Sequence, residues 1–213
     1  MGTFRGENLS CVRGGRVVFA RLAFALRAGG ALVLAGPNGS GKSSLLRLMA
    51  GLTPAAAGRL SWEGEAVADD PAAHRQRLHY VGHLDAIKPA LTARETLVIA
   101  AGLRSGDGDL GSAAADALGV MGIARLADVP VRYFSAGQRR RLALARLFAS
   151  PAPLWLLDEP RTALDAAAVA GLDEAMARHR EDGGMIVAAL HGGVAYPDGA
   201  DMLDLAAFSD GRR

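Results

Sequence analysis

Cysteine and long apolar runs are the two features that this chain of 213 residues most clearly lacks. Its one cysteine, Cys11, cannot form an internal disulfide, which makes a reducing compartment the simplest interpretation. No uninterrupted apolar stretch approaches the roughly 20 residues that a transmembrane helix needs, and residues 1–10 contain no apolar core of a secretory signal. We therefore expect no direct membrane insertion, and any link to a membrane must come through a partner.

Excess charge and lysine are also scarce. The formal net charge is +2 at pH 7, so the composition gives no reason to expect a nucleic-acid partner. Of the 24 basic residues, only Lys42 and Lys88 are lysines. Because Lys42 lies in a glycine-rich loop, we expect its ammonium group to have a specific role.

The chain does contain an alternation of apolar strands and amphipathic helices. Half of its residues are hydrophobic, and its length suits one compact domain. Alternation of strands and helices predicts a parallel sheet covered by helices, with a mostly helical, alanine-rich insert that begins at residue 91. Strands are expected at residues 16–26, 31–35, 60–62, 78–81, 154–157 and 185–190. Helices are expected at residues 43–52, 138–149 and 165–180.

Residues 36–43 read GPNGSGKS and match the phosphate-binding pattern G-x-x-x-x-G-K-[ST] in full. The motif follows an expected buried strand and opens an expected helix, which distinguishes a phosphate loop from a chance glycine-rich turn. Its glycines allow backbone N–H groups to surround phosphate oxygens, and the helix N-terminus adds partial positive charge. Lys42 is expected to reach the β- and γ-phosphates of ATP, and the Ser43 hydroxyl to coordinate Mg²⁺. The predicted ATP-binding residues of this loop are Gly36, Pro37, Asn38, Gly39, Ser40, Gly41, Lys42, Ser43 and Ser44.

An acidic pair follows another expected strand. Residues 154–157 are apolar, and Asp158 and Glu159 come directly after them. A strand of this kind carries both carboxylates to its C-terminal edge, where α/β sheets bind ligands. We expect Asp158 to bind Mg²⁺ directly or through water, and Glu159 to orient and polarise the attacking water. The alternative is an ordinary surface turn.

A third motif, FSAGQRRRL at residues 134–142, narrows the class of phosphate-loop protein. It resembles the LSGGQ signature of ABC ATPases. Ser135 and the Gly137 amide precede an amphipathic helix and can bind an anion, although Ser135 could also be an ordinary helix N-cap. The resemblance implies that Ser135 and Gly137, with Gln138 beside them, bind ATP held by the phosphate loop of another subunit. We interpret the three arginines at 139–141 as a solvated helix face.

Two weaker signals complete the site. Residues 162–165 resemble the D-loop of ABC ATPases, although Asp165 could simply cap the next helix. His191 follows the expected strand at 185–190, where the family has its switch histidine, which would contact the γ-phosphate. The predicted catalytic residues are therefore Lys42, Glu159 and His191. The predicted metal ligands are Ser43 and Asp158.

The resemblance to ABC ATPases covers nearly the whole chain. It implies an α/β fold, in which a RecA-like P-loop NTPase core carries an N-terminal antiparallel β subdomain and an inserted helical subdomain. We assign residues 1–213 to a single domain, with 1–84 and 150–213 as the nucleotide-binding core and 85–149 as the helical subdomain. The implied partners are a second copy of the chain in the ATP-bound state and an integral membrane permease. Such a chain would lie at the cytoplasmic face of the bacterial inner membrane.

Within this family, the chain is most similar to the ATP-binding subunits of the bacterial cytochrome c maturation, or haem exporter, system. Residues 81–92, VGHLDAIKPALT, look like the GH-x-x-x-IK-x-x-LT stretch of that group. The resemblance implies ATP-driven haem export or release of a haem-loaded chaperone. The alternatives are an exporter for another cargo, a soluble ABC ATPase outside transport, and a nucleotide switch that does not hydrolyse.

Three positions depart from the family pattern, one of which is the D-loop, where Arg161 and Thr162 stand in place of the commoner serine. The glutamine that senses Mg²⁺ and the γ-phosphate is replaced by Leu84, and either His83 or Asp85 could substitute for it. Residues 12–16 contain no aromatic side chain to stack on adenine, which leaves the flat guanidinium of Arg13 as the candidate.

Overall fold

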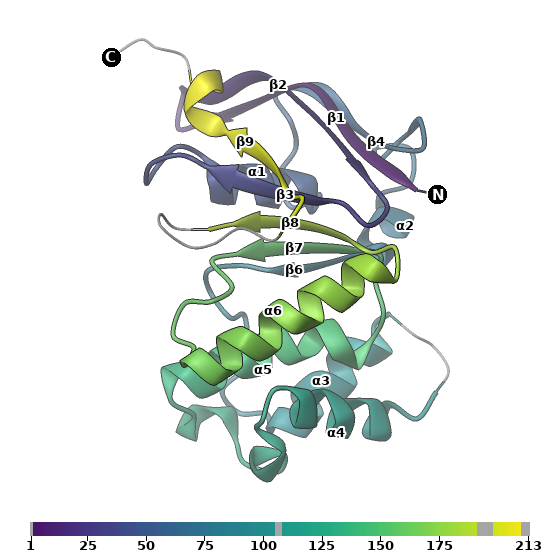
Figure 1. Ribbon diagram of the computed structural model, residues 1–213, viewed down its shortest axis with the longest axis vertical. Coiled ribbons are helices and arrows are strands. Elements are labelled where there is room, and N and C mark those ends of the chain that lie inside the picture. Colours follow the sequence, from purple (N-terminus) through teal and green to yellow (C-terminus); the bar gives the residue numbers. More distant parts are fainter. Residues whose placement is uncertain (1, 105–107, 191–197, 210–213) are drawn as a thin grey trace.

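The computed structural model describes residues 2–104, 108–190 and 198–209. An antiparallel sheet lies at one end of the molecule, a parallel sheet crosses its middle, and a helical lobe lies at the other end (Figure 1). The strands are β1 (Thr3–Arg13), β2 (Arg16–Arg27), β3 (Ala31–Ala35), β4 (Ala57–Trp62), β5 (Glu65–Ala66), β6 (Leu78–Val81), β7 (Leu154–Asp158), β8 (Met185–Ala189) and β9 (Asp201–Asp204). The α-helices are α1 (Lys42–Met49), α2 (Pro71–Gln76), α3 (Ala93–Gly102), α4 (Leu110–Val120), α5 (Ala136–Ala149) and α6 (Ala166–Glu181).

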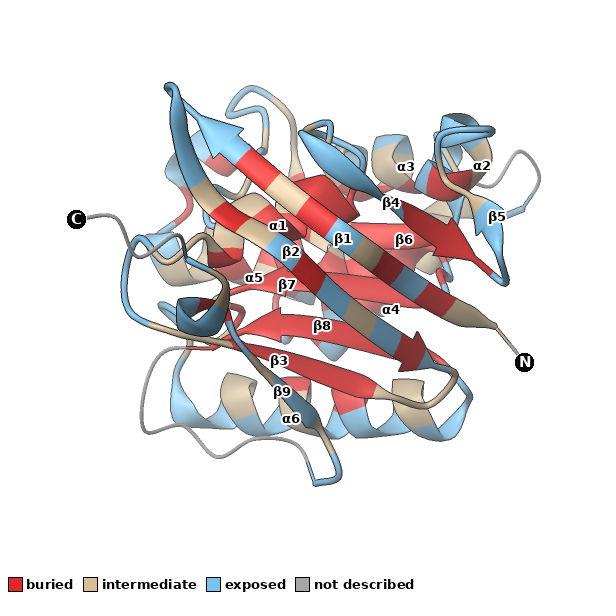
Figure 2. Cartoon of the chain, turned by 90° about the horizontal axis from the view of Figure 1, so that it is seen from above, coloured by how far each residue is buried: buried red, intermediate tan, exposed pale blue. Residues whose placement is uncertain are grey.

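The antiparallel sheet has the strand order β2-β1-β4-β5. Its first hairpin closes tightly, because Arg13 pairs with Arg16 and only Gly14 and Gly15 lie between them. Both glycines have positive φ, 54° and 74°, as the favoured two-residue hairpin turn requires. One face of this hairpin packs inward through Phe4 and other apolar side chains that alternate with exposed residues (Figure 2).

The parallel sheet has the order β6-β7-β8-β3-β9 and positions the candidate site. Its central strands β7 and β8 are buried along their whole length, which explains their continuous apolar sequences (Figure 2). Leu34 of β3 and Asp158 of β7 both pair with Ala189 of β8, from opposite sides. The carboxyl ends of β3 and β7 are therefore separated by a single strand, about 10 Å across.

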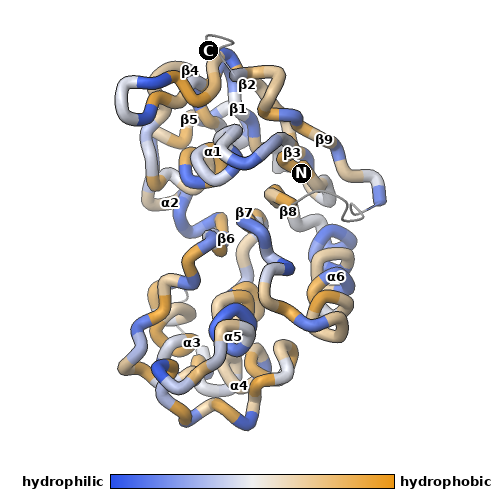
Figure 3. Tube along the Cα trace, turned by 90° about the vertical axis from the view of Figure 1, so that its left-hand side faces the viewer, coloured by the Kyte–Doolittle hydropathy of each residue, from blue (hydrophilic) through white to orange (hydrophobic). Residues whose placement is uncertain are grey.

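Two hydrophobic cores lie on the two faces of the parallel sheet. One joins the antiparallel sheet to α1 and includes Phe4, Leu45 and Leu156. The other joins the opposite face to the helical lobe and includes Leu144 and Leu157. Figure 3 shows the β-rich part and the α3–α5 lobe on either side of β6 and β7. The sheet therefore serves as the common support of both parts.

The structure confirms every strand and helix that the sequence predicts, with ends shifted by a few residues. The predicted helical insert contains α3 and α4, and the predicted helix at 138–149 begins two residues earlier, at Ala136. Elements with weak sequence signals, namely β1, β5, α2 and β9, were not expected individually. Among the described residues, no helix has both the length and the apolarity to cross a bilayer.

Candidate nucleotide site

The loop between β3 and α1 has a backbone that depends on glycine. Gly36, Gly39 and Gly41 have φ values of 127°, 80° and 102°. A Cβ at Gly41 would lie 2.5 Å from Val18 Cγ1, so close packing against β2 also excludes a side chain there. The loop thus has the tight turn that its sequence predicts.

Lys42, the first residue of α1, is held inside this loop. Its Nζ donates hydrogen bonds to the carbonyl oxygens of Gly36 at 2.7 Å and Pro37 at 3.0 Å, and the residue is only 7% exposed. The first turn of α1 contains no acidic residue. The ammonium group and the positive end of the helix dipole therefore combine to favour an anion.

Two carboxylates stand at the end of β7. Asp158 is 2% exposed, and its Oδ2 has no hydrogen-bond partner among the described residues. Glu159 has φ of 50°, a left-handed conformation that is uncommon outside glycine, and its amide donates to the Ala189 carbonyl at 3.0 Å. A buried carboxylate oxygen without a donor is unfavourable unless a ligand satisfies it.

Mg²⁺ is the cation that the family resemblance implies, and the residues present fit it. The Ser43 hydroxyl and the unpaired Asp158 oxygen are hard oxygen donors of the kind that Mg²⁺ prefers. Within the described ranges, no group of three or more His, Cys, Asp or Glu side chains could hold a metal by itself. This agrees with Mg²⁺ sites in which one or two protein oxygens act together with substrate phosphates.

A cavity of about 490 Å³ brings most of these groups together. Its volume is within the usual range for small-molecule sites. Gly36, Pro37, Ser40 and Asp158 do not line it, but Gly36 and Pro37 accept the hydrogen bonds of Lys42. The lining residues are Arg13, Val18, Asn38, Gly39, Gly41, Lys42, Ser43, Ser44, His83 and Glu159.

The loop after β6 brings one of its two polar candidates to this cavity. His83 lines it, with His83 Nδ1 3.9 Å from Glu159 Oε2. Asp85 is held by α5 instead, since its Oδ1 lies 3.4 Å from Arg140 Nη1. Leu84 between them is exposed and does not line the cavity. Geometry therefore favours His83 over Asp85 as the group of this loop that faces a bound nucleotide.

The signature residues lie elsewhere in the chain's own structure. Ser135 caps α5 in a capping box, in which Gln138 N donates to Ser135 Oγ at 3.2 Å and Ser135 N donates to Gln138 Oε1 at 2.8 Å. Ser135 is exposed, and with Gly137 and Gln138 it lines a separate cavity of about 300 Å³. A Cβ at Gly137 would lie 2.8 Å from the Ala163 carbonyl oxygen, which ties this turn to the segment after β7.

The interpretation of the three arginines as a solvated helix face is wrong for Arg140. Its side chain is 5% exposed, and its guanidinium donates to backbone carbonyls of two distant segments. A helical period could have indicated this, because Arg140 lies four and seven residues before the buried Leu144 and Leu147.

The remaining predicted residues have mixed outcomes. Asp165 does cap α6, since its Oδ1 accepts from Ala168 N at 2.9 Å. Thr162 Oγ1 lies 3.4 Å from Glu159 Oε2. Arg13 lines the cavity and donates to Thr53 Oγ1 at 3.2 Å, so a role in adenine stacking stays a prediction. His191 lies outside the described residues.

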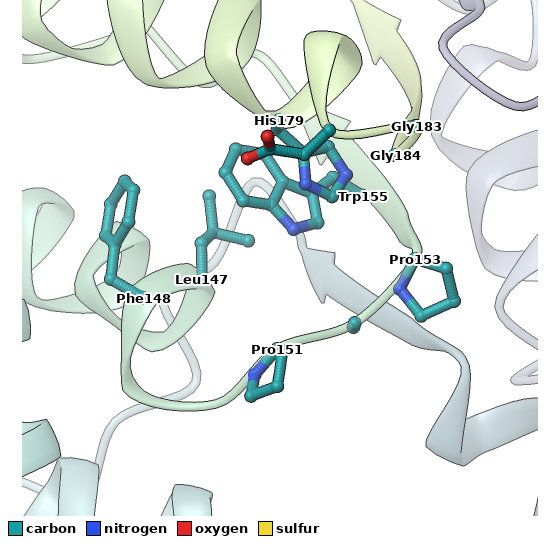
Figure 4. Close-up of a pocket in the computed structure, with 10 residues that line it drawn as sticks. Leu147, Phe148, Pro151, Pro153, Trp155, His179, Gly183 and Gly184 are labelled. Atoms are coloured by element: carbon teal, nitrogen blue, oxygen red, sulfur yellow. The ribbon is translucent and has the colours of Figure 1, made fainter.

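A second cavity, of about 630 Å³, lies near the amino ends of β7 and β8, whereas the nucleotide site lies at the carboxyl ends of the strands. Trp155, near the start of β7, stacks on His179 of α6 with ring centroids 3.9 Å apart (Figure 4). Burial lowers the pKa of His179. Ligands of parallel sheets bind at the carboxyl ends of the strands, so this aromatic cavity is not part of the nucleotide site.

The layered fold, the phosphate loop and the acidic pair together define a P-loop nucleotide-binding protein. A family model described as ABC transporter matches residues 19–162, and the chain belongs to this family as one of its ATPase chains.

Curated relatives and a solved structure agree with this assignment. The chain is 55% identical over 208 residues to the cytochrome c biogenesis ATP-binding export protein CcmA of Paramagnetospirillum magneticum, covering 97% of this chain and 95% of the relative. It is 56% identical to CcmA of Rhodospirillum rubrum over 206 residues, covering 97% and 87%. A post-hydrolysis dimer of the ATP-binding cassette MJ0796 with ADP and Pi has a TM-score of 0.80 at 23% identity, covering 88% of each chain. That likeness confirms the predicted fold class.

Proposed function

We propose that the chain hydrolyses ATP to power an export step in cytochrome c biogenesis. The relatives named above are called cytochrome c biogenesis ATP-binding export proteins, and each match covers 97% of this chain. The sequence resemblance adds haem, or a haem-loaded chaperone, as the species that is exported or released.

In this proposal, MgATP binds in the cavity at the phosphate loop. Lys42 contacts the β- and γ-phosphates, and Ser43 and Asp158 hold the metal. Mg²⁺, when bound, neutralises negative charge on the phosphate oxygens. Glu159 orients the attacking water and accepts its proton, and His83 lies beside it on the wall of the same cavity.

The separation of two anion-binding turns carries the proposal. The turn at Ser135 is exposed, and it lines a different cavity from the loop at Lys42. One copy of the chain therefore presents the two turns at two separate cavities. A second copy, arranged head to tail, can offer Ser135 and Gly137 to the γ-phosphate held at Lys42. The solved relative bound to ADP and Pi is itself a dimer.

Coupling to a membrane permease is the second part of the proposal. Residues 1–84 and 150–213 form the nucleotide-binding core, and residues 85–149 form the helical part that transmits its motion. Leu84, in the loop that leads into the helical part, and Ile99 and Leu103, at the C-terminal end of α3, are large apolar side chains that are exposed. They suit contact with the cytoplasmic loops of a permease at the inner membrane.

The variant Glu159→Gln tests the catalytic assignment, because it keeps the shape of the side chain and removes the proton acceptor. We expect ATP turnover to fall by about 100-fold or more. We also expect a dimer to accumulate with MgATP, measured by light scattering after size exclusion. Glu181→Gln, an exposed change at the end of α6, is the control and should behave as wild type.

Two results would contradict the proposal. Near-wild-type turnover in Glu159→Gln would show that another group activates water. A monomer at every MgATP concentration, despite bound nucleotide, would exclude the head-to-tail arrangement.

A further inference from the structure

Arg140 is a buried cation at the junction of three segments. From α5, its Nη2 donates to the carbonyl oxygens of Asp158 at 2.7 Å and Glu159 at 2.8 Å. Its Nη1 donates to the Gly82 carbonyl at 2.8 Å and lies 3.4 Å from Asp85 Oδ1. One guanidinium therefore connects the helix after the signature turn, the acidic end of β7 and the loop that leads into the helical lobe.

The buried charge of Arg140 is only partly compensated by its hydrogen-bond partners. Within the described residues, Asp85 is the one carboxylate that contacts the Arg140 cation, and the other three acceptors are neutral backbone carbonyls. Arg140 Nε has no hydrogen-bond partner within the described residues. A buried charge with such incomplete compensation stabilises a fold less than an apolar side chain of similar size would. Stability alone therefore does not explain an arginine here.

Arg140 donates a hydrogen bond to a residue with a strained backbone conformation, Glu159. Glu159 has φ of 50°, and its carbonyl accepts both from Arg140 and from Thr162 N, the latter at 3.2 Å. A residue in this region of φ and ψ stays there only when its surroundings fix it. Loss of the guanidinium would remove the Arg140 donor from the carbonyls of both Asp158 and Glu159, and the turn could relax.

We infer that Arg140 is a positioning residue for ATP hydrolysis, an inference that rests on the proposed function. It fixes the Glu159 backbone and, through Gly82, holds His83 at a set position opposite the Glu159 carboxylate. A displacement of about 1 Å at a reacting group can cost 100-fold in rate, so this constraint acts on the chemical step.

Arg140 also connects the signature turn at Ser135 to the acidic end of β7. It lies five residues after Ser135 on the same helix, a rise of about 7.5 Å. A helix moves as a rigid body over that length, so contact of Ser135 with the partner's nucleotide shifts the guanidinium as well. Engagement of the second copy and placement of Glu159 are thereby linked through one side chain.

Two substitutions and one control test this role in the full-length chain. Arg140→Gln removes the charge and most donors, whereas Arg140→Lys keeps the charge with fewer directed donors. Arg146→Lys is the control, because Arg146 is on the same helix and bonds the Asp85 carbonyl at 3.3 Å without contacting Asp158 or Glu159. Circular dichroism reports folding, and steady-state ATPase assays give kcat and KM.

The expected result is a loss in kcat without a loss in nucleotide binding. For Arg140→Gln, kcat should fall by about tenfold or more while KM changes by less than about twofold. Arg140→Lys should be intermediate, and Arg146→Lys should stay within about twofold of wild type. Folded Arg140→Gln protein with wild-type kcat, or with a rise in KM alone, would overturn the inference.

If Arg140→Gln does not fold, amide hydrogen exchange in Arg140→Lys tests the inference instead. In Arg140→Lys, the amides of Glu159 and Thr162 should exchange faster than in wild type, and unchanged protection there would overturn the inference. This readout does not need hydrolysis. A wild-type chain that binds ATP but does not turn it over contradicts the proposed function, and the exchange data still test Arg140.

Discussion

His83 and Glu159 lie beside each other on the wall of the nucleotide cavity. The 3.9 Å between His83 Nδ1 and Glu159 Oε2 is too long for a direct hydrogen bond. Two polar atoms at this separation can contact the same water molecule, and Thr162 Oγ1 lies 3.4 Å from the same carboxylate oxygen. In the proposed mechanism, these groups would hold the attacking water between the γ-phosphate and Glu159.

We predict that His83→Ala lowers kcat by about tenfold while KM changes little, because the change removes a group that orients water and leaves Lys42 and Ser43 in place. His83→Gln should recover part of the loss, since an amide can also hydrogen-bond to water. Leu84→Ala is the control, because this neighbouring side chain is exposed and does not line the cavity. Steady-state ATPase assays give the comparison, and wild-type kcat in His83→Ala would exclude the assignment.

Single residues differ in how far the sequence reveals them. Lys42 and Asp158 belong to contiguous motifs, so their chemistry can be inferred from near neighbours. Arg140 bonds carbonyls 18, 19 and 58 residues away, and no local pattern contains those partners. The choice between His83 and Asp85 likewise required the contact between Asp85 and α5, which only the folded chain shows.

At the scale of elements, α3 and α5 begin with the same N-terminal motif, a capping box. Thr92 Oγ1 accepts from Glu95 N at 3.1 Å, and the Glu95 side chain accepts from Thr92 N at 2.8 Å. Ser135 and Gln138 make the equivalent pair at the start of α5. The two helices thus have matched capping boxes, but only the cap of α5 is proposed to contact nucleotide.

Because the two helix caps are alike, comparing them distinguishes the contribution of Ser135 to stability from its proposed contact with nucleotide. Thr92→Ala and Ser135→Ala should each lower the free energy of unfolding by about 1 kcal/mol, because each leaves helix N–H groups without an acceptor. Only Ser135→Ala should also weaken ATP-driven dimer formation in the Glu159→Gln background. Urea unfolding and light scattering measure the two effects. Equal dimerisation in both variants would show that Ser135 is only a structural cap.

Buried elements were easier to predict than edge elements. β3, β7 and β8 have continuous apolar sequences because both faces of the parallel sheet are covered. β9 lies at the edge of the same sheet, and three of its four residues are exposed, so its sequence carries no strand signal. Its pairing with β3 depends on tertiary contacts between segments that are more than 160 residues apart.

At the scale of the whole molecule, covering both faces of the parallel sheet also buries titratable groups. His79 of β6 is 8% exposed, and its Nε2 lies 2.7 Å from the Ser150 carbonyl oxygen. Burial lowers the pKa of His79 to about 4, and the nearby cations Arg104 and Arg146 contribute in the same direction. Burial likewise lowers the pKa values of His74 and His179.

These shifts make the stability of the fold sensitive to mild acid. The pKa of His79 is lower in the folded chain than the 6.5 of an unperturbed histidine, so the unfolded chain binds more protons between pH 6.5 and 4. The stabilisation is fully present above pH 6.5 and is lost as pH falls through this window. For His79 alone, the free energy of unfolding should fall by about 2 kcal/mol between pH 7 and pH 5.

The variant His79→Gln isolates this contribution. It removes the titrating ring, so its free energy of unfolding should decrease less than that of wild type between pH 7 and pH 5, by about 2 kcal/mol. Leu84→Ala, a change at an exposed side chain that does not titrate, should retain the wild-type dependence. Urea unfolding curves at several pH values give these differences. An identical pH dependence in His79→Gln and wild type would mean that the folded chain accommodates a charged His79, and that this part of the core is open to water.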